Sequence, residues 1–346
     1  MKNIFYNELY QKDLELCKKE IERLRDSSIL ITGANGLIGS FIVDAIYRAN
    51  ILYNTNIKIY ALSRNYKRLE NRFIYDKEKN ISYIEQDINK SFDFNFNVDY
   101  IIHAASNAYP SVIYNDPVGT ILSNIHGTYN LLNYMKKING KRMLFVSTGE
   151  IYGNSIDDVE AFKEEDSGIV DILNIRSSYP ISKRCAENLC ISYANQFEID
   201  VVISRLCHVY GPNNSELDNR ANVQFINDAV NNRNIILKSK GEQIRSYIYI
   251  SDCVSGILKV LLDGNNKEAY NIANKDSILS ISSFAEKVAT LASTKVIYKI
   301  SNEGKTLFSR AVLDSKKLEL LKWNPYFNID KGIKRTLEIS KWLKNK

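Results

Sequence analysis

The amino-acid sequence predicts an α/β protein that is built on a doubly wound parallel sheet and carries a smaller C-terminal α/β lobe. Short, almost continuous apolar runs alternate with helical patterns, and a glycine-rich turn follows the first run. Such runs fit parallel strands that are buried on both faces, and their alternation with helices is typical of a doubly wound sheet. The predicted strands are Ser28–Thr32, Ile57–Leu62, Ile81–Glu85, Tyr100–His103, Met143–Ser147 and Val201–Leu206.

Helical patterns separate these strands, and a further one precedes them. The predicted helices between strands include Ser40–Ala49, Thr120–Lys137 and Ile181–Gln196. In the charged segment 1–26, apolar residues recur at the spacing of one helix face, at Leu14, Cys17, Ile21 and Leu24. We therefore expect an amphipathic N-terminal helix that packs on the main domain.

Composition and charge narrow the class of protein. The 346 residues include 46 Lys and Arg and 40 Asp and Glu, for a formal net charge of +6. This small excess does not predict nucleic-acid binding, although it suits an anionic substrate. Five cysteines without a CxxC pair indicate free thiols in a reducing compartment. Three scattered histidines predict no metal site, and no signal peptide or membrane-spanning run is present, so we expect a soluble, cytoplasmic protein without a membrane partner.

The first predicted strand ends in a GxxGxxG loop that opens a helix. Glycines in such a loop allow a tight turn and a close approach of dinucleotide phosphates, which then face the helix N-terminus. A glycine triplet alone is a weak signal, but here it lies at the first strand–helix turn, where the chemistry requires it. The candidate cofactor-binding residues of this loop are Gly33, Asn35, Gly36, Leu37, Ile38 and Gly39.

Later strand ends add to this Rossmann-type cofactor site. A carboxylate after the second strand would favour NAD, but the chain has Ser63 and Arg64 there, with Arg68 one turn later. An arginine at that point can pair with a 2′-phosphate, so we favour NADP and keep NAD open. Further candidate cofactor-binding residues follow the third and fourth strands, at Asp87, Ile88, Ala104, Ala105 and Ser106.

Three segments follow from these patterns. We assign 1–26 to an N-terminal helical extension and 27–206 to the NAD(P)-binding Rossmann domain. After residue 206 the regular pattern loosens at the turn cluster Gly211-Pro212-Asn213-Asn214. We assign 207–346 mainly to a substrate-binding lobe that is discontinuous and interleaved with the core.

Tyr179 and Lys183 form a YxxxK pair at the start of a predicted helix, where their spacing places both side chains on one face. A free tyrosine is a poor base at neutral pH, but a nearby ammonium favours the phenolate. The pair can therefore move a proton to or from an alcohol oxygen while a hydride moves to a nicotinamide. We expect both residues to be catalytic and to contact the cofactor.

The segment after the fifth strand supplies partners for this pair. Thr148 can hydrogen-bond the same oxygen that Tyr179 serves, and Glu150 can act as a general base. Thr148, Glu150, Tyr179 and Lys183 are therefore the candidate catalytic residues.

The order and spacing of these motifs resemble the extended short-chain dehydrogenases, the family of NAD-dependent epimerases and dehydratases that act on nucleotide sugars. Three further stretches, within about residues 28–260, support the resemblance: His103-Ala104-Ala105-Ser106, the run Arg205 to Pro212, and the run Gly241 to Asp252. The resemblance implies a nucleoside diphosphate sugar as substrate and a homodimer through two core helices. It also implies that Lys183 holds the nicotinamide ribose and that Arg245 meets the substrate pyrophosphate. The candidate substrate-binding residues are Thr148, His208, Arg220 and Arg245.

Within the family, the Ser147–Gly153 segment and the run Arg176-Ser177-Ser178-Tyr179 are most similar to UDP-glucuronate decarboxylases and 4,6-dehydratases. Two departures stand out: Gly149 replaces an acid or hydroxyl residue, and His208 stands where the family often has asparagine. We expect an enzyme that oxidises a sugar C4 hydroxyl to a transient ketone, assists chemistry at C5 in epimerase, decarboxylase or dehydratase fashion, and returns the hydride. The alternatives are an NADPH-dependent reductase of an activated keto-sugar and a non-catalytic dinucleotide-binding protein.

Overall fold

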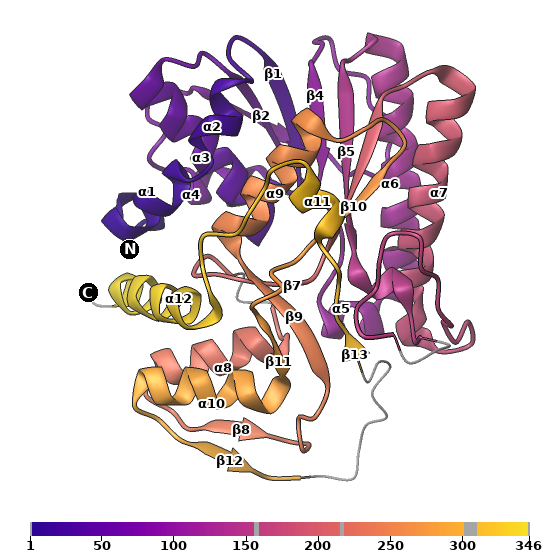
Figure 1. Ribbon diagram of the computed structural model, residues 1–346. Helices are drawn as coiled ribbons and strands as arrows, with labels where there is room; N and C mark the ends of the chain where they lie inside the picture. The colour runs from indigo at the N-terminus through magenta and orange to yellow at the C-terminus, as the bar shows by residue number, and fades with distance from the viewer. Residues whose placement is uncertain (1, 156–158, 215–217, 301–309, 345–346) are drawn as a thin grey trace.

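A computed structural model describes residues 2–155, 159–214, 218–300 and 310–344, and it confirms the predicted doubly wound sheet (Figure 1). All neighbouring strands of this seven-stranded sheet run parallel. In sheet order, the strands are β10 (Ala269–Ile272), β6 (Val201–Leu206), β5 (Arg142–Thr148), β4 (Tyr100–His103), β1 (Ser28–Thr32), β2 (Lys58–Ser63) and β3 (Ile81–Glu85).

Helices cover the sheet in two pairs. The pair α3 (Leu37–Tyr53) and α9 (Ile250–Asp263) packs together, as does the pair α6 (Pro117–Ile138) and α7 (Ser178–Phe197). Local sequence sets the helix ends: Asp116 caps α6 by accepting a hydrogen bond from the backbone N–H of Gly119, Pro117 takes the first position, and Asn139 ends the helix in a left-handed conformation. Shorter helices lie at α4 (Tyr66–Arg72), α5 (Pro110–Asn115) and α11 (Lys316–Leu320).

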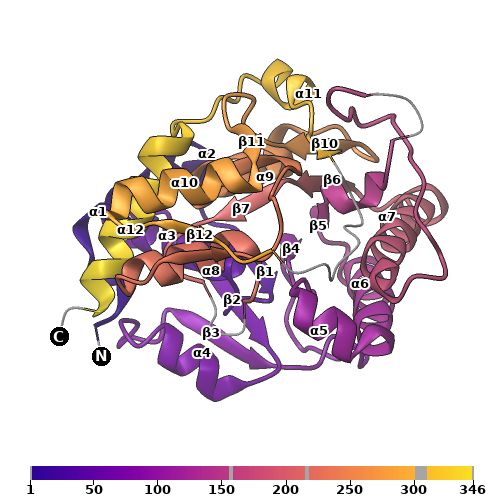
Figure 2. The same cartoon turned by 90° about the horizontal axis from the view of Figure 1, so that it is seen from below.

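The second lobe is built from short strands and three mutually packed helices, seen below the sheet in Figure 1 and face-on in Figure 2. Strand β10 belongs to the main sheet, although elements of the lobe precede and follow it in sequence, so the chain crosses back into the core and out again. The lobe contains β7 (His208–Tyr210), α8 (Ala221–Val230), β8 (Ile235–Leu237), β9 (Ile244–Tyr249), β11 (Ile278–Ser280), α10 (Ile281–Ala292), β12 (Val296–Tyr298), β13 (Arg310–Ala311) and α12 (Ile329–Lys344).

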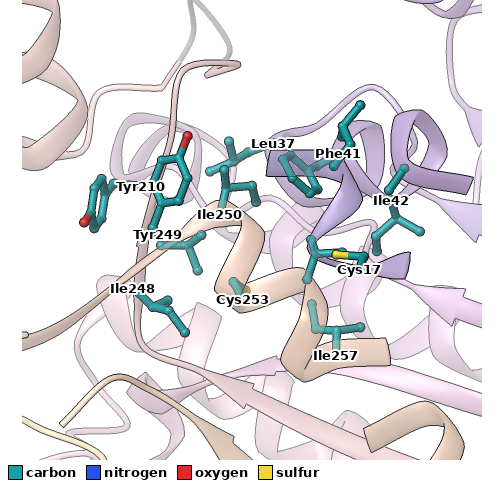
Figure 3. Close-up of a cluster of buried hydrophobic side chains, with 14 of the residues drawn as sticks. Cys17, Leu37, Phe41, Ile42, Tyr210, Ile248, Tyr249, Ile250, Cys253 and Ile257 are labelled. Atoms are coloured by element: carbon teal, nitrogen blue, oxygen red, sulfur yellow. The ribbon is translucent and has the colours of Figure 1, made fainter. Parts of the chain in front are cut away.

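Residues 2–26, which we call the N-terminal strap, do not form the single helix that the periodicity predicts. A 3-10 turn (Ile4–Tyr6) is followed by α1 (Glu8–Glu15) and α2 (Lys18–Glu22), with a break at Cys17. The expected apolar face is nevertheless buried, because α1 packs on α3 and α12 while α2 packs on α3 and α9. Figure 3 shows Cys17 beside side chains of α3 and α9. The strap therefore joins the cofactor half to the substrate lobe.

Polar contacts reinforce this junction. The Tyr10 hydroxyl donates to Asp44 on α3, at 2.7 Å. Asp13 accepts hydrogen bonds from Tyr249 of β9, at 2.7 Å, and from Arg335 of α12, at 2.6 Å. Each of these contacts ties the strap to an element far away in the chain.

The described residues show neither a metal-binding cluster nor a membrane-spanning helix. No group of three or more His, Cys, Asp or Glu side chains in the described residues is arranged to hold a metal ion. None of the helices in the same residues is long and apolar enough to cross a membrane.

Candidate active site

The glycine loop lies between β1 and α3 and leaves no room for side chains. Gly33 has a φ of +67°, and a Cβ atom there would meet the Cα of Ala105 at 2.8 Å. A Cβ atom at Gly39 would meet the backbone of Gly33 and Ala34. Because the turn is this tight, the N-terminus of α3 opens directly onto the carboxyl ends of β1 and β4, which is the geometry that a dinucleotide pyrophosphate requires.

Two adjoining cavities of about 240 and 150 Å³ lie along this loop and gather the predicted cofactor residues. The larger one is lined by Gly33, Asn35, Gly36, Ser63, Arg64, Asp87, Ile88, Ala104, Ala105 and Ser106. The smaller one, on the catalytic side, is lined by Gly33, Gly36, Leu37, Ile38, Gly39, Ala104, Ser106, Tyr179 and Lys183. These residues fit a dinucleotide, with its two ends in the two cavities, although their contacts with it stay predictions.

The end of β2 presents positive charge to the larger cavity. Arg64 and Arg68 are exposed and line it beside Ser63. Asn65, between them, is occupied in capping α4 by accepting a hydrogen bond from the backbone N–H of Arg68, at 2.9 Å. No carboxylate stands among the residues that follow β2 up to Arg68, so this end of the site suits an additional phosphate.

Tyr179 and Lys183 lie in the first turns of α7 and are buried, with 7% and 2% of their surfaces exposed. The Lys183 ammonium donates to the carbonyl of Val146, at 2.7 Å, and burial lowers its pKa to about 7. Burial and the Glu150 carboxylate raise the pKa of Tyr179 to about 12. The hydrogen bond with Thr148 and the charges of Arg176 and Arg220 act in the opposite direction and lower it. The effect of Lys183 on this pKa stays a prediction.

A third cavity of about 360 Å³ adjoins the catalytic side of the cofactor cavities. It is lined by all four predicted substrate-binding residues, Thr148, His208, Arg220 and Arg245, and by Glu150 and Tyr179. Thr148, Tyr179 and Arg220 line both this cavity and the smaller cofactor cavity. A ligand in this third cavity, which we call the sugar cavity, would therefore lie against the predicted proton-transfer pair.

Two arginines of the lobe bring positive charge to the sugar cavity. Arg220 occupies the N-cap position of α8, and its Nε donates to Asp218, at 2.9 Å. Arg245, on β9, is 8% exposed, and burial lowers its pKa. Guanidinium groups in such a position suit a substrate pyrophosphate. His208 also lines the cavity, and burial together with the charges of these two arginines lowers its pKa to about 3, so the imidazole is neutral at neutral pH.

Glu150 is held by an arginine for which the sequence analysis predicted no role. Glu150 lies in the 3-10 turn Gly149–Tyr152, directly after β5, and Arg176 lies in a second such turn, Ile175–Ser177. Arg176 Nη2 donates to Glu150 Oε1, at 2.8 Å, and both side chains line the sugar cavity. In the sequence, the signal for this contact is the arginine three residues before Tyr179, which belongs to a pattern shared with the family.

Gly149 lies against a second residue that the sequence analysis missed. A Cβ atom at Gly149 would meet both methyl groups of Leu313 at 3.0 Å, and Leu313 also lines the sugar cavity. Leu313 follows β13, far away in sequence, so no local pattern predicts the contact. The wall beside Glu150 is therefore apolar, at the position where an acid or a hydroxyl was expected from the family.

Comparisons with known proteins agree with this geometry. The model of the NAD dependent epimerase/dehydratase family matches residues 29–273. The chain is 31% identical to UDP-glucuronic acid decarboxylase 3 of Arabidopsis thaliana over 308 residues, which cover 88% of this chain and 86% of that protein.

Solved structures show the same fold. The dTDP-glucose 4,6-dehydratase of Streptomyces venezuelae superposes with a TM-score of 0.77 at 23% identity, covering 92% of this chain and 97% of that one. UDP-glucuronic acid 4-epimerase of Bacillus cereus superposes with a TM-score of 0.74 at 23% identity, covering 91% of this chain and 99% of that one. The family match across most of the chain confirms the resemblance seen in the motifs, and the chain belongs to the NAD dependent epimerase/dehydratase family.

Proposed function

We propose that this enzyme oxidises the C4 hydroxyl of a nucleoside diphosphate uronic acid, breaks a bond at C5 of the resulting ketone, and then restores the C4 hydroxyl. The observation that carries the proposal is the shared wall of the sugar and cofactor cavities, where Thr148 and Tyr179 line both and Glu150 lines the sugar side. A nicotinamide dinucleotide, when bound, takes up a hydride from the sugar and gives it back.

The side chains of this wall divide the proton chemistry. Tyr179 takes the proton of the C4 hydroxyl and later returns it, and Thr148 orients the same oxygen. Their contact supports this assignment, because the hydrogen bond with Thr148 lowers the pKa of Tyr179 against the effect of burial. Lys183 lies one turn further along α7 and holds the cofactor side of the site.

The residues beside Glu150 favour chemistry at C5 over loss of water. Elimination of a hydroxyl needs a proton donor near the leaving oxygen. Position 149 is a glycine packed against Leu313, so it offers no proton. Glu150 remains as a base beside the sugar. Decarboxylation or epimerisation therefore fits the site better than dehydration, and a uronic acid is also the substrate named for the decarboxylase relative and the structural neighbour.

We assign the pyrophosphate of the substrate to Arg220 and Arg245 and the adenosine 2′-phosphate of NADP to Arg64 and Arg68. The second assignment rests on the exposed pair at the end of β2. Replacing Arg64 and Arg68 together by Ala should weaken NADP binding about tenfold or more relative to NAD. Equal loss for both dinucleotides would favour NAD as the native cofactor.

We further propose a cytoplasmic homodimer. All five cysteines are free, which suits a reducing compartment. On α6, Val118, Leu122 and Tyr129 are 65%, 39% and 47% exposed and recur on one helix face, which supports a contact between copies. Light scattering of the intact protein and of Leu122→Arg tests the dimer. A wild-type monomer would refute it.

The test of the reaction uses UDP-glucuronic acid as probe. We expect bound dinucleotide near one per chain after denaturation, no net consumption of added cofactor, and conversion of the probe to a UDP-pentose with CO₂ or to a C5-inverted uronate. Nuclear magnetic resonance of the sugar distinguishes these products. Failure to convert any of a panel of UDP- and dTDP-linked uronates would refute the proposed substrate class.

A second candidate, an NADPH-dependent reductase of a nucleotide-linked keto-sugar, is favoured by Arg64 and Arg68 and by Gly149. If this candidate is right, the purified protein should contain no bound dinucleotide. It should bind NADPH preferentially and consume one NADPH for each substrate molecule.

A further inference from the structure

The Glu150–Arg176 pair leaves one buried polar atom of each side chain without a hydrogen-bond partner among the described residues. One oxygen and one nitrogen satisfy each other, at 2.8 Å. The other two atoms, Glu150 Oε2 and Arg176 Nη1, are buried and have no hydrogen-bond partner in the described part of the chain. A buried polar atom that lacks a hydrogen-bond partner costs folding free energy. Such groups in a cavity wall point to a ligand that completes them.

We propose that Arg176 and Glu150 form a subsite for the C5 substituent of the sugar, and that Arg176 serves the step that follows oxidation. This inference rests on the proposed function and extends it to a residue with no assigned role. Arg176 is a positioning residue for Glu150, and it meets the substrate through its second guanidinium nitrogen.

The position of the pair selects this part of the substrate. The Arg176 guanidinium carbon lies 5.7 Å from the centre of the Tyr179 ring. Tyr179 serves the C4 oxygen, so a group held by Arg176 belongs to a neighbouring ring carbon. Thr148 lies two residues before Glu150. Together with Tyr179, it also lines the smaller cofactor cavity on the other side of this wall. The pair therefore faces C5 and the atoms attached to it.

The chemistry of the two unpartnered atoms defines the ligand. Arg176 Nη1 can only donate, so it requires an oxygen acceptor such as a carboxylate or a hydroxyl on C6. Glu150 Oε2, as a carboxylate oxygen, can accept a proton. One group of the sugar thus offers an oxygen to Arg176, and the adjacent C5–H offers a proton to Glu150.

A ketone at C4 makes bonds at C5 labile, because their electron pair can move to the C4 oxygen. In epimerisation the C5–H bond breaks, the proton goes to Glu150 Oε2, and the electron pair becomes an enolate that Tyr179 stabilises by its hydroxyl proton. In decarboxylation the C5–C6 bond breaks, CO₂ leaves, and the electron pair of that bond forms the enolate of a 4-keto pentose, which then takes up a proton from solvent at C5. Arg176 keeps its charge in both cases and fixes the geometry.

The test compares Arg176→Met, Arg176→Lys and a matched control, Arg184→Met, with UDP-glucuronic acid. Arg184 is also a half-buried arginine of the α7 region, but it donates to the backbone carbonyls of Ile151, at 2.6 Å, and Gly168, at 2.8 Å, and does not line the sugar cavity. Two quantities are followed: the rate of the first oxidation, from the near-ultraviolet absorbance of the reduced cofactor, and the rate of product formation.

We expect Arg176→Met to form reduced cofactor within about threefold of the wild-type rate and to slow product formation about 100-fold, so that the oxidised intermediate accumulates. Arg176→Lys should recover part of product formation, because it restores a charged donor. Arg184→Met should lower thermal stability and leave the ratio of the two rates unchanged.

The outcomes separate the two proposals. If wild type never reduces its cofactor with any uronate, the proposed function fails. If wild type makes product and Arg176→Met slows both rates equally, or neither, Arg176 has only a structural role and this inference is wrong.

Discussion

Two regions of the molecule bury carboxylates beside arginines and tyrosines, and they differ in how completely the polar atoms are used. In the strap junction, Asp44 accepts hydrogen bonds from Tyr10, Arg72 and Tyr75, so both of its oxygens are engaged. In the sugar cavity, Glu150 and Arg176 each retain an unpartnered buried atom among the described residues. A cluster in which every polar atom is hydrogen-bonded contributes stability and specific packing. A cluster in a cavity wall that keeps unpartnered polar atoms retains the capacity to bind a ligand.

The same contrast separates the effects that substitutions should have. Changes in the strap junction should lower the free energy of unfolding and spare the chemistry of each folded molecule. Changes in the sugar cavity should impair the chemistry of each folded molecule and leave the free energy of unfolding near that of wild type. Four predictions test this division.

The largest effect is expected in the cavity. Tyr179→Phe removes the hydroxyl that exchanges a proton with the substrate, so turnover should fall about 10³- to 10⁴-fold. Cofactor content and unfolding free energy should stay near those of wild type, because the ring still fills its place. Turnover, released dinucleotide and urea denaturation measure the three quantities. Retained activity would show that the proton-transfer role is misassigned.

Asp44→Ala should produce the largest loss of stability, about 3–5 kcal/mol, because the buried Arg72 guanidinium loses its counter-charge. Turnover per folded molecule should be unchanged at low temperature. The control is Glu22→Gln, which disrupts an exposed pair with Lys18 at 3.9 Å and should cost about 0.5 kcal/mol or less. A large loss of turnover at full folding would place the junction in the catalytic machinery.

The pH dependence of stability should report Asp13. Burial raises its pKa from 3.8 to about 6, despite the opposing hydrogen bond from Tyr249 and charge of Arg335. Since the folded-state pKa lies above the unfolded one, the protonated form favours folding, and this stabilisation is lost as pH rises from about 4 to about 6. The loss is at most about 3 kcal/mol, at about 1.4 kcal/mol per unit. Asp13→Asn should flatten the stability profile in that window, as urea titrations at several pH values would show. An unchanged slope would contradict the assignment.

The smallest effect is expected from Tyr10→Phe. It removes one of several donors to Asp44, so the unfolding free energy should fall by only about 1–2 kcal/mol. The same urea series measures it. If the loss equalled that of Asp44→Ala, the network would depend on a single contact rather than on its redundancy.

Local patterns predicted the sheet well, because buried parallel strands are coded by short apolar runs. The strands Ile81–Glu85, Tyr100–His103 and Val201–Leu206 begin and end where expected. The helix Ser40–Ala49 proved longer, as α3 (Leu37–Tyr53), because Gly36 of the loop forms its cap and Asn54 ends it in a left-handed conformation.

Contacts between distant segments were outside the reach of these patterns. Arg176 meets Glu150 only because two short turns converge on α7 and β5. Leu313 reaches Gly149 from a segment near the end of the described chain. In the strap, the periodicity identified the buried face correctly but could not reveal the break at Cys17, which lets the segment follow both α3 and the lobe.

The placement of β10 also constrains how the protein is made. During synthesis, β6 emerges long before its outer neighbour β10, and β6 remains the edge strand of the main sheet until residue 272 has left the ribosome. Exposed strand edges invite pairing with other chains. A nascent chain paused within the lobe would therefore be prone to aggregate, and truncation after residue 206 would release a sheet with an open edge rather than an independent cofactor domain.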